Sequence, residues 1–244
     1  MTLVVSPHLD DAAFSCGGLV AALGRAGKVT VITCFTRSVP QPTGFALACQ
    51  RDKGLDDGVD YMALRREEDA NAMNILGVSY RWLNLPEAPH RGYHSAPDLF
   101  AGVHSDDRVA GPLVQALTQE LAQPDIDTVL YPLGAGNHAD HLQVVAAVEE
   151  LRAALPTVRF IQYYDQPYTN RHPPKDAGLS DLPIMTTSAL PHTVPGDYRY
   201  LPEPEMVELK WSASRAYTTQ LPFQFGTEAG MQQLLGQEEY FRVR

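Results

Sequence analysis

Short apolar runs alternate with helical patterns from the first residues of the chain onward. Residues 3–5 form an apolar run that ends at a Ser-Pro pair, and residues 11–27 then carry apolar side chains at helical spacing up to a glycine. Residues 29–35 form the next run, which is rich in β-branched residues and too short for a helix. A strand, a helix and a second strand in this order predict a parallel βαβ unit, which restricts the chain to an α/β sheet fold.

The same alternation continues along most of the chain. The pattern predicts further helices at 61–76, around 109–121 and at 138–155, and further strands at 80–85, 127–131 and 158–164. This order favours an α/β fold of the Rossmann-like type, with an open, mostly parallel sheet and helices on both faces. We expect the 244 residues to form a single domain.

Segments rich in proline, glycine and polar residues interrupt the alternation. These irregular excursions lie near residues 37–60, 86–105 and 165–202. Long loops in compact domains often act as lids over a binding site. A strand or two near 184–189 is expected inside the third excursion, and two helices, at 203–219 and 227–240, are expected after it.

Composition and charge disfavour several classes of function. The chain has 19 basic and 29 acidic residues and a formal net charge of -10, so we expect no nucleic-acid partner. No run of about 18 apolar residues could span a membrane, and the N-terminus lacks the features of a signal peptide. Cys16, Cys34 and Cys49 match neither a disulfide framework nor a metal clamp. We expect a cytoplasmic protein without membrane contact, and homo-oligomerisation stays open.

Two polar clusters follow predicted strands. The first strand runs into Ser6-Pro7-His8-Leu9-Asp10-Asp11, and the fourth is followed by a segment that ends in His138-Ala139-Asp140-His141. In open α/β sheets, ligands bind outside the carboxyl ends of the strands. We therefore expect the side chains of both clusters to face one binding site at that edge of the sheet.

The two clusters together contain residue types that can hold a catalytic zinc ion. Such a site has three nitrogen or oxygen ligands from the protein and one position open to water. His8, Asp11 and His141 can supply this set, which predicts one Zn²⁺ per chain. Asp10 and His138 would then remain beside the metal as candidate base and acid, the groups that hydrolysis of an amide requires.

Each motif also has a structural interpretation. Asp is favoured at helix N-termini, so either polar cluster alone could be a helix start. Two such clusters, each at a predicted strand end, favour a functional site. The pair Gly17-Gly18 fits no phosphate-loop pattern and is better explained by close packing of a helix. A metal-dependent hydrolase of another bond and a non-catalytic Rossmann-like binding module remain the alternative functions.

The motifs resemble those of a known family. The segment Pro7-His8-Leu9-Asp10-Asp11, with Gly17-Gly18 after it, and the later His138-Ala139-Asp140-His141 resemble the two signature motifs of the LmbE-like (PIG-L) zinc-dependent N-acetylglucosaminyl deacetylases. Arg65-Arg66-Glu67-Glu68 resembles the Arg-x-x-Glu helix of that family, and residues 163–168 resemble its aromatic-rich strand end. The resemblance implies one LmbE-like deacetylase domain over residues 1–244.

The resemblance also implies a reaction and a role for each residue. The reaction is zinc-dependent removal of an N-acetyl group from an N-acetylglucosamine-type conjugate or a similar small polar substrate. The implied zinc ligands are His8, Asp11 and His141. Asp10 would be the general base, and His138 would steady the oxyanion or protonate the amine. Asp140 would orient a histidine, and Arg65 would bind a substrate hydroxyl or carboxylate.

Overall fold

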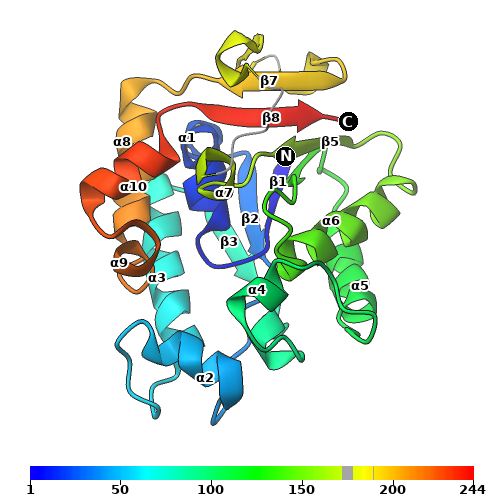
Figure 1. Ribbon diagram of the computed structural model, residues 1–244. Helices are drawn as coiled ribbons and strands as arrows, with labels where there is room; N and C mark the ends of the chain where they lie inside the picture. The colour runs from blue at the N-terminus through cyan, green and yellow to red at the C-terminus, as the bar shows by residue number, and fades with distance from the viewer. Residues whose placement is uncertain (172–177, 189) are drawn as a thin grey trace.

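One eight-stranded sheet forms the centre of the protein in the computed structural model, which describes residues 1–171, 178–188 and 190–244 (Figure 1). The strand order is β3-β2-β1-β4-β5-β8-β7-β6. The strands are β1 Thr2–Ser6, β2 Val29–Thr33, β3 Ser79–Trp82, β4 Thr128–Pro132, β5 Arg159–Tyr163, β6 Ile184–Met185, β7 Gly196–Tyr200 and β8 Glu239–Val243. The strands β1 to β5 are parallel to one another, so the prediction of an open, mostly parallel sheet is confirmed.

Helices cover both faces of this sheet, as predicted. They are α1 Asp11–Arg25, α2 Gly44–Arg51, α3 Tyr61–Leu76, α4 Ala96–Leu99, α5 Ala110–Leu121, α6 Ala139–Arg152, α7 Tyr168–Arg171, α8 Pro204–Arg215, α9 Leu221–Phe225 and α10 Glu228–Leu235. On one face α1 packs against α3 and α8, and on the other α5 packs against α6 (Figure 1). Within the described part of the chain, none of the helices is long and apolar enough to cross a membrane.

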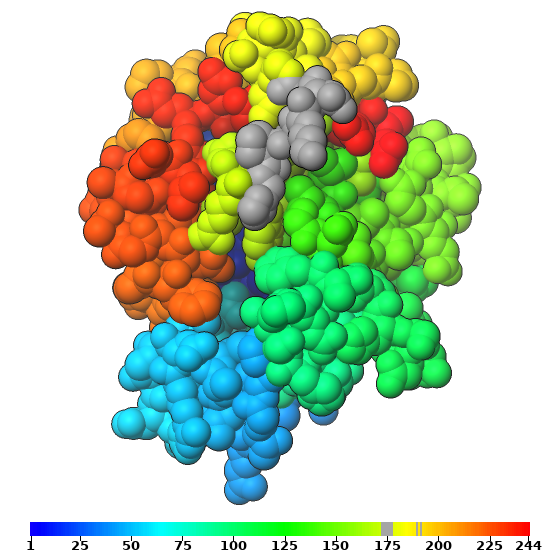
Figure 2. Space-filling model, in the orientation of Figure 1, coloured from blue at the N-terminus to red at the C-terminus, as the bar shows by residue number. Residues whose placement is uncertain are grey.

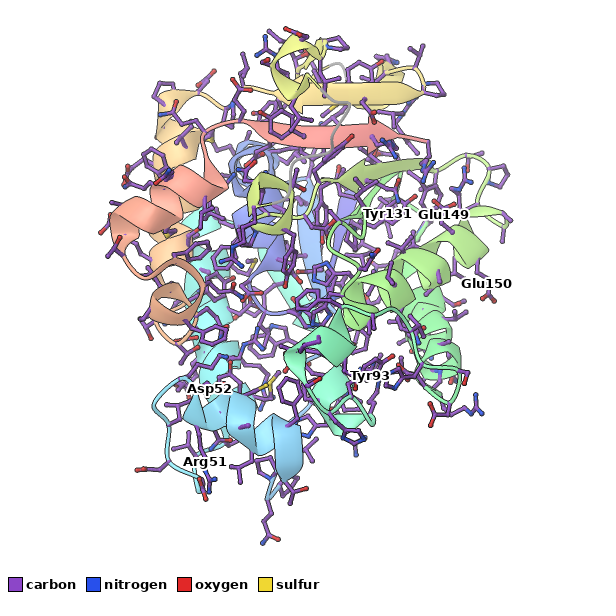
Figure 3. All side chains as sticks on the ribbon, in the orientation of Figure 1. Arg51, Asp52, Tyr93, Tyr131, Glu149 and Glu150 are labelled. Atoms are coloured by element: carbon purple, nitrogen blue, oxygen red, sulfur yellow. The ribbon has the colours of Figure 1, made fainter. Side chains whose placement is uncertain are left out.

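Alternate residues of each central strand face two separate hydrophobic cores. In β1, Val4 packs into the core formed with α1, α3 and α8, whereas Leu3 and Val5 pack into the core formed with α5 and α6. The continuous apolar run at the start of the sequence reflects burial on both faces. On the second face the hydroxyl of Tyr131 in β4 donates a hydrogen bond of 2.5 Å to Glu149 in α6 (Figure 3).

The adjacent glycines of α1 allow close packing of this helix. A Cβ atom at Gly17 would lie 3.1 Å from Cγ of Lys210, and one at Gly18 would lie 2.7 Å from Cγ of Pro202. The Gly18 N–H donates to Glu239 at 2.7 Å, and Glu239 forms a buried ion pair with Lys210 at 3.2 Å. The geometry therefore supports the packing interpretation of these glycines.

The C-terminal end of the chain differs from its prediction. A single helix over 227–240 is wrong, because α10 ends at Leu235 and the chain continues as β8. Gly236 has a positive φ of 64°, a conformation that favours glycine, and Glu239–Val243 then shows the alternating burial of a strand. The helix predicted over 203–219 corresponds to the shorter α8.

The three irregular excursions contain more regular structure than predicted. The first includes α2, the second includes α4, and the third includes β6 and β7. β6 lies inside the range expected for a strand, but β7 was not expected. β7 pairs antiparallel with β8, which comes much later in the sequence, so its hydrogen-bond partner left no local signal. Residues 172–177 and 189 of the third excursion lie outside the described residues.

The topology brings the two polar clusters to one edge of the sheet. β1 and β4 are neighbours and run parallel, with Thr2 opposite Thr128. Their carboxyl ends therefore lie at the same edge, where β1 leads into α1 and β4 leads through a loop into α6.

Candidate active site

A pocket of about 300 Å³ lies at this edge of the sheet. Its opening is visible between the surfaces of α2, α4 and α9 (Figure 2). The pocket is lined by six of the residues predicted from the sequence, namely His8, Asp10, Asp11, Arg65, His138 and Asp140. The seventh, His141, is fully buried next to Asp11. The structure thus brings all the predicted site residues together.

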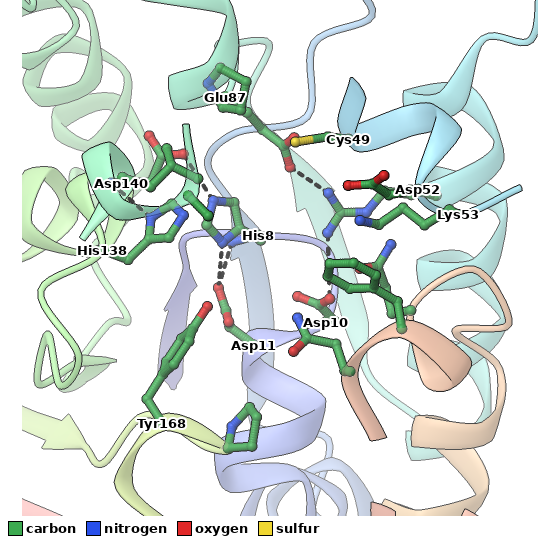
Figure 4. Close-up of a pocket in the computed structure, with 18 of the residues that line it drawn as sticks. His8, Asp10, Asp11, Cys49, Asp52, Lys53, Glu87, His138, Asp140 and Tyr168 are labelled. Atoms are coloured by element: carbon green, nitrogen blue, oxygen red, sulfur yellow. Dashed lines mark hydrogen bonds and ion pairs between the residues drawn. The ribbon is translucent and has the colours of Figure 1, made fainter. Parts of the chain in front are cut away.

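His8, Asp11 and His141 form a compact buried group. Oδ2 of Asp11 lies 3.2 Å from Nδ1 of His8 (Figure 4). The same oxygen lies 3.2 Å from Nε2 of His141, and the possible ligand atoms of the three residues all lie within 4.8 Å of one another. Ligands around a tetrahedral zinc ion are roughly 3.3 Å apart, given bonds of about 2.0–2.1 Å. Nε2 of His141 is buried and forms no hydrogen bond to any described residue. These three residues fit a divalent metal ion.

The electrostatics of the group also favour a cation. Burial alone would lower the pKa of His141, but Asp11 and Asp165 raise it to about 9. Burial likewise opposes protonation of His8, yet Asp11 and Asp140 hold its pKa well above the usual range. Burial disfavours the charged form of Asp11, but the two imidazoles keep its pKa well below its ordinary value. A divalent cation would supply the positive charge that these carboxylates attract.

The turn between β1 and α1 fixes the first cluster. The backbone N–H of His8 donates to Oδ2 of Asp11 at 2.8 Å, and the N–H of Ala12 donates to the hydroxyl of Ser6 at 3.2 Å. Asp10 occupies the N-cap position of α1, but its side chain makes no capping hydrogen bond. The helix-start interpretation therefore does not account for the carboxylate of Asp10.

Asp10 lies beside the candidate metal group and next to Arg65. Burial raises the pKa of Asp10 to about 7, against the opposing effect of the Arg65 guanidinium. Nη2 of Arg65 lies 3.4 Å from Oδ2 of Asp10, and Nη1 of Arg65 is hydrogen-bonded to Glu87 (Figure 4). Both terminal nitrogens of Arg65 thus contact carboxylates, which makes this residue a partner of Asp10. A contact between Arg65 and substrate stays a prediction.

His138 both begins the helix α6 and lines the pocket. It is the N-cap residue of α6, and its Nδ1 accepts a hydrogen bond of 3.2 Å from the N–H of Asp140. Nε2 must then carry the ring hydrogen. Burial, together with the nearby His8, lowers the pKa of His138 to about 3. The ring is therefore neutral and can donate through Nε2, but it holds no second proton to give to a leaving group.

Asp140 contacts His8 and a second set of partners. Nε2 of His8 lies 2.9 Å from Oδ2 of Asp140, which also accepts the N–H of Ala88 at 3.0 Å. Oδ1 of Asp140 lies 2.7 Å from Nη1 of Arg91. His8, His138 and Asp140 also lie close enough to hold a metal ion. Nδ1 of His138 already accepts the N–H of Asp140, whereas Nε2 of His141 forms no hydrogen bond to a described residue, so the group with Asp11 and His141 fits a metal better.

Sequence reasoning missed Asp165 and Arg91. Asp165 follows β5, and its Oδ1 lies 2.6 Å from Nδ1 of His141. In the sequence, Asp165 stands out only as a single acidic residue after an apolar run. The two polar clusters also follow predicted strands. Arg91 pairs with Asp140 and with Asp107, the latter at 2.9 Å. The segment around Arg91 shows no periodic pattern that could have indicated these contacts.

Aromatic side chains form the outer part of the pocket. Phe100 packs edge-on against His138 and Tyr168, with ring centroids 5.2 and 5.7 Å apart. Phe223 in α9 is 54% exposed, and Nζ of Lys53 lies 3.5 Å from the centre of its ring. The pocket therefore has a charged inner end and an aromatic mouth.

The sequence matches a known family model and a curated protein. Residues 3–152 match the PIG-L family model, described as GlcNAc-PI de-N-acetylase. The chain is 37% identical over 175 residues to 2'-N-acetylparomamine deacetylase from Streptomyces fradiae, covering 70% of this chain and 58% of that protein. The chain thus spans less than two thirds of the length of this curated relative.

Solved structures of deacetylases share the fold. The zinc-inhibited form of teicoplanin deacetylase Orf2 aligns with a TM-score of 0.78 and 22% identity, covering 99% of this chain and 97% of the other. The A40926 pseudoaglycone deacetylase Dbv21 aligns with a TM-score of 0.77 and 23% identity, covering 99% and 96%. Because the family model spans more than half of the sequence and includes both polar clusters, the chain belongs to the PIG-L family.

Proposed function

We propose that the chain is a zinc-dependent deacetylase that removes the acetyl group from the nitrogen of an N-acetylated amino sugar. The observation that carries this proposal is the buried group of His8, Asp11 and His141 at the inner end of a pocket, with Asp10 and His138 beside it. The PIG-L family match and the relative that acts on 2'-N-acetylparomamine support it.

The donor set suits zinc. Two imidazole nitrogens and one carboxylate oxygen match the ligands of catalytic zinc sites, whereas magnesium and calcium prefer oxygen ligands alone. Zinc held by these residues would supply Lewis acidity, which lowers the pKa of water and polarises a carbonyl group.

Asp10 is the proposed proton carrier. A carboxyl group with a pKa of about 7 can take a proton from the attacking water and return it near neutral pH. The same group can then deliver that proton to the departing amine nitrogen, so that water and the amide give acetic acid and a primary amine. Arg65 keeps Asp10 in place through the contact of 3.4 Å.

His138 is the proposed donor to the oxyanion. Its neutral ring presents Nε2–H, because Nδ1 is occupied by the N–H of Asp140. A fixed donor of this kind stabilises the negative charge that develops on the amide oxygen. The low pKa of His138 favours this role over protonation of the amine.

The aromatic mouth is suited to the part of the substrate that does not react. Phe100 and Phe223 offer apolar surface to the C–H face of a sugar ring. A pocket of about 300 Å³ is at the small end of the range for ligand sites. A small amino-sugar conjugate therefore fits better than a long polysaccharide.

The proposal is tested by measuring acetate and primary amine released from a panel of compounds with zinc supplied. The panel contains 2'-N-acetylparomamine, N-acetylglucosamine conjugates and, as controls, an O-acetyl ester and a phosphomonoester. We expect equal amounts of acetate and amine from at least one N-acetylated sugar. Hydrolysis of the phosphomonoester without any amide cleavage would contradict the proposal.

A further inference from the structure

We infer that Asp165 is a positioning residue for the metal group: it fixes the ring of His141 so that Nε2 faces Asp11, and it holds the loop between β4 and α6 in place. This inference rests on the proposed metal site and extends it to a residue outside the family-matched residues 3–152.

The carboxylate of Asp165 joins three parts of the fold. Asp165 follows β5 and is 1% exposed. Its Oδ1 lies 2.6 Å from Nδ1 of His141 in the first turn of α6. Its Oδ2 accepts the N–H groups of Gly134 and Ala135, each at 2.8 Å, in the loop that follows β4. One side chain thus connects the ends of β4 and β5 with the start of α6.

This hydrogen bond determines which nitrogen of His141 can bind a metal. An ionised carboxylate only accepts hydrogen bonds, so Nδ1 of His141 must carry a hydrogen. In a neutral imidazole the other nitrogen then presents its lone pair. That nitrogen, Nε2, lies 3.2 Å from Oδ2 of Asp11 and forms no hydrogen bond to a residue that the structure describes.

The loop that Asp165 holds carries His138 to the site. Gly134 and Gly136 have φ values of 84° and 87°, and Asn137 has a φ of 61°. The left-handed Gly134 and the residue after it supply the two consecutive N–H groups that donate to one oxygen of Asp165. The loop then ends at His138, so the same carboxylate supports both histidines of the second cluster.

The other imidazole of the metal group has a matching arrangement. Nε2 of His8 lies 2.9 Å from Asp140, which leaves Nδ1 facing Asp11 at 3.2 Å. The two histidines thus present opposite ring nitrogens, and a buried carboxylate behind each ring selects the nitrogen. Carboxylates behind metal-bound histidines commonly change metal affinity when they are replaced.

The test replaces Asp165 by asparagine and measures zinc affinity by competition with a chromophoric chelator. In Asp165→Asn the amide oxygen can still accept from the loop N–H groups, while the amide N–H₂ faces Nδ1 of His141 and favours hydrogen on Nε2. We expect zinc binding to weaken about 10- to 100-fold. The matched control is Asp98→Asn, which alters an Asp–His pair of 2.8 Å with His104, outside the metal group, and should leave zinc affinity unchanged.

A second measurement needs no variant. In the zinc-loaded parent protein, nitrogen-15 NMR of the histidine rings should show hydrogen on Nδ1 of His141 and zinc on Nε2. An Asp165→Asn protein that binds zinc within about twofold of the parent would overturn the role of Asp165 while leaving the metal site intact. Hydrogen on Nε2 of His141 would overturn both the role of Asp165 and the assignment of this nitrogen as a zinc ligand. A parent protein that binds no zinc would instead refute the proposed function on which this inference rests.

Discussion

Residues 3–152 and the residues after them contribute to the pocket in different ways. The first region, which matches the family model, contains the whole candidate metal group together with Asp10 and His138. The second region supplies Asp165 behind His141 and wall residues such as Tyr168 and Phe223. The residues proposed for the chemistry thus lie in the part shared with the family. The residues after 152 position His141 and form part of the pocket wall.

The largest effect should come from removing a proposed metal ligand of the first region. In His141→Ala we expect zinc affinity to fall by orders of magnitude and activity to be lost with it. The protein should remain folded, because the two cores on the sheet supply its stability. Elemental analysis and circular dichroism measure the two outcomes. A variant that keeps zinc as tightly as the parent would show that the ligand assignment is wrong.

The next largest effect should come from Asp10. Asp10→Asn keeps the size of the side chain but removes the base, so kcat should fall about 10²- to 10⁴-fold while zinc content stays at one per chain. Steady-state kinetics measures the loss of turnover, and zinc analysis shows whether the variant retains the metal. Asp57→Asn, at an exposed ion pair with Arg51, is the control and should retain parental kcat. Near-parental kcat in Asp10→Asn would remove this residue from the mechanism.

His138 should have a similar or smaller effect, without a change in pH dependence. His138→Ala removes a donor to the oxyanion, and we expect kcat to fall about 10²-fold. Because its pKa is lowered to about 3, His138 is neutral at any pH above that value, so it contributes no limb to the profile between about pH 5 and pH 9. The pH dependence of kcat should keep its shape in the variant. Loss of one limb would show that His138 titrates during the reaction.

The smallest effect should come from the second region. Phe223→Ala removes apolar surface at the mouth, worth about 1 kcal/mol, and should raise KM roughly fivefold with little change in kcat. Ile184→Ala, at another exposed apolar residue in the strand β6, is the matched control. A large fall in kcat for Phe223→Ala would mean that the division between chemistry and substrate fit does not hold.

The same two regions differ in how far the sequence predicted them. The strands β1 to β5 and their helices were predictable, because burial on two sheet faces produces local apolar runs and helical periodicity. The rule that ligands bind at strand ends then predicted, from the sequence alone, that His8 and His141 lie together. β7 and β8 were missed because each depends on a partner distant in the sequence. Asp165 had only the weak signal of a single acidic residue after a strand, and the role of Arg91 appears only in contacts across the fold.

Anomalous diffraction at the zinc absorption edge, from crystals of the zinc-loaded protein, tests the central claim most directly. We predict one anomalous peak per chain, bonded to Nδ1 of His8, Oδ2 of Asp11 and Nε2 of His141. The absence of a peak would contradict the account. A peak bonded instead to the alternative group of His8, His138 and Asp140 would also contradict it, because His138 would then be a ligand and could not serve as the oxyanion donor.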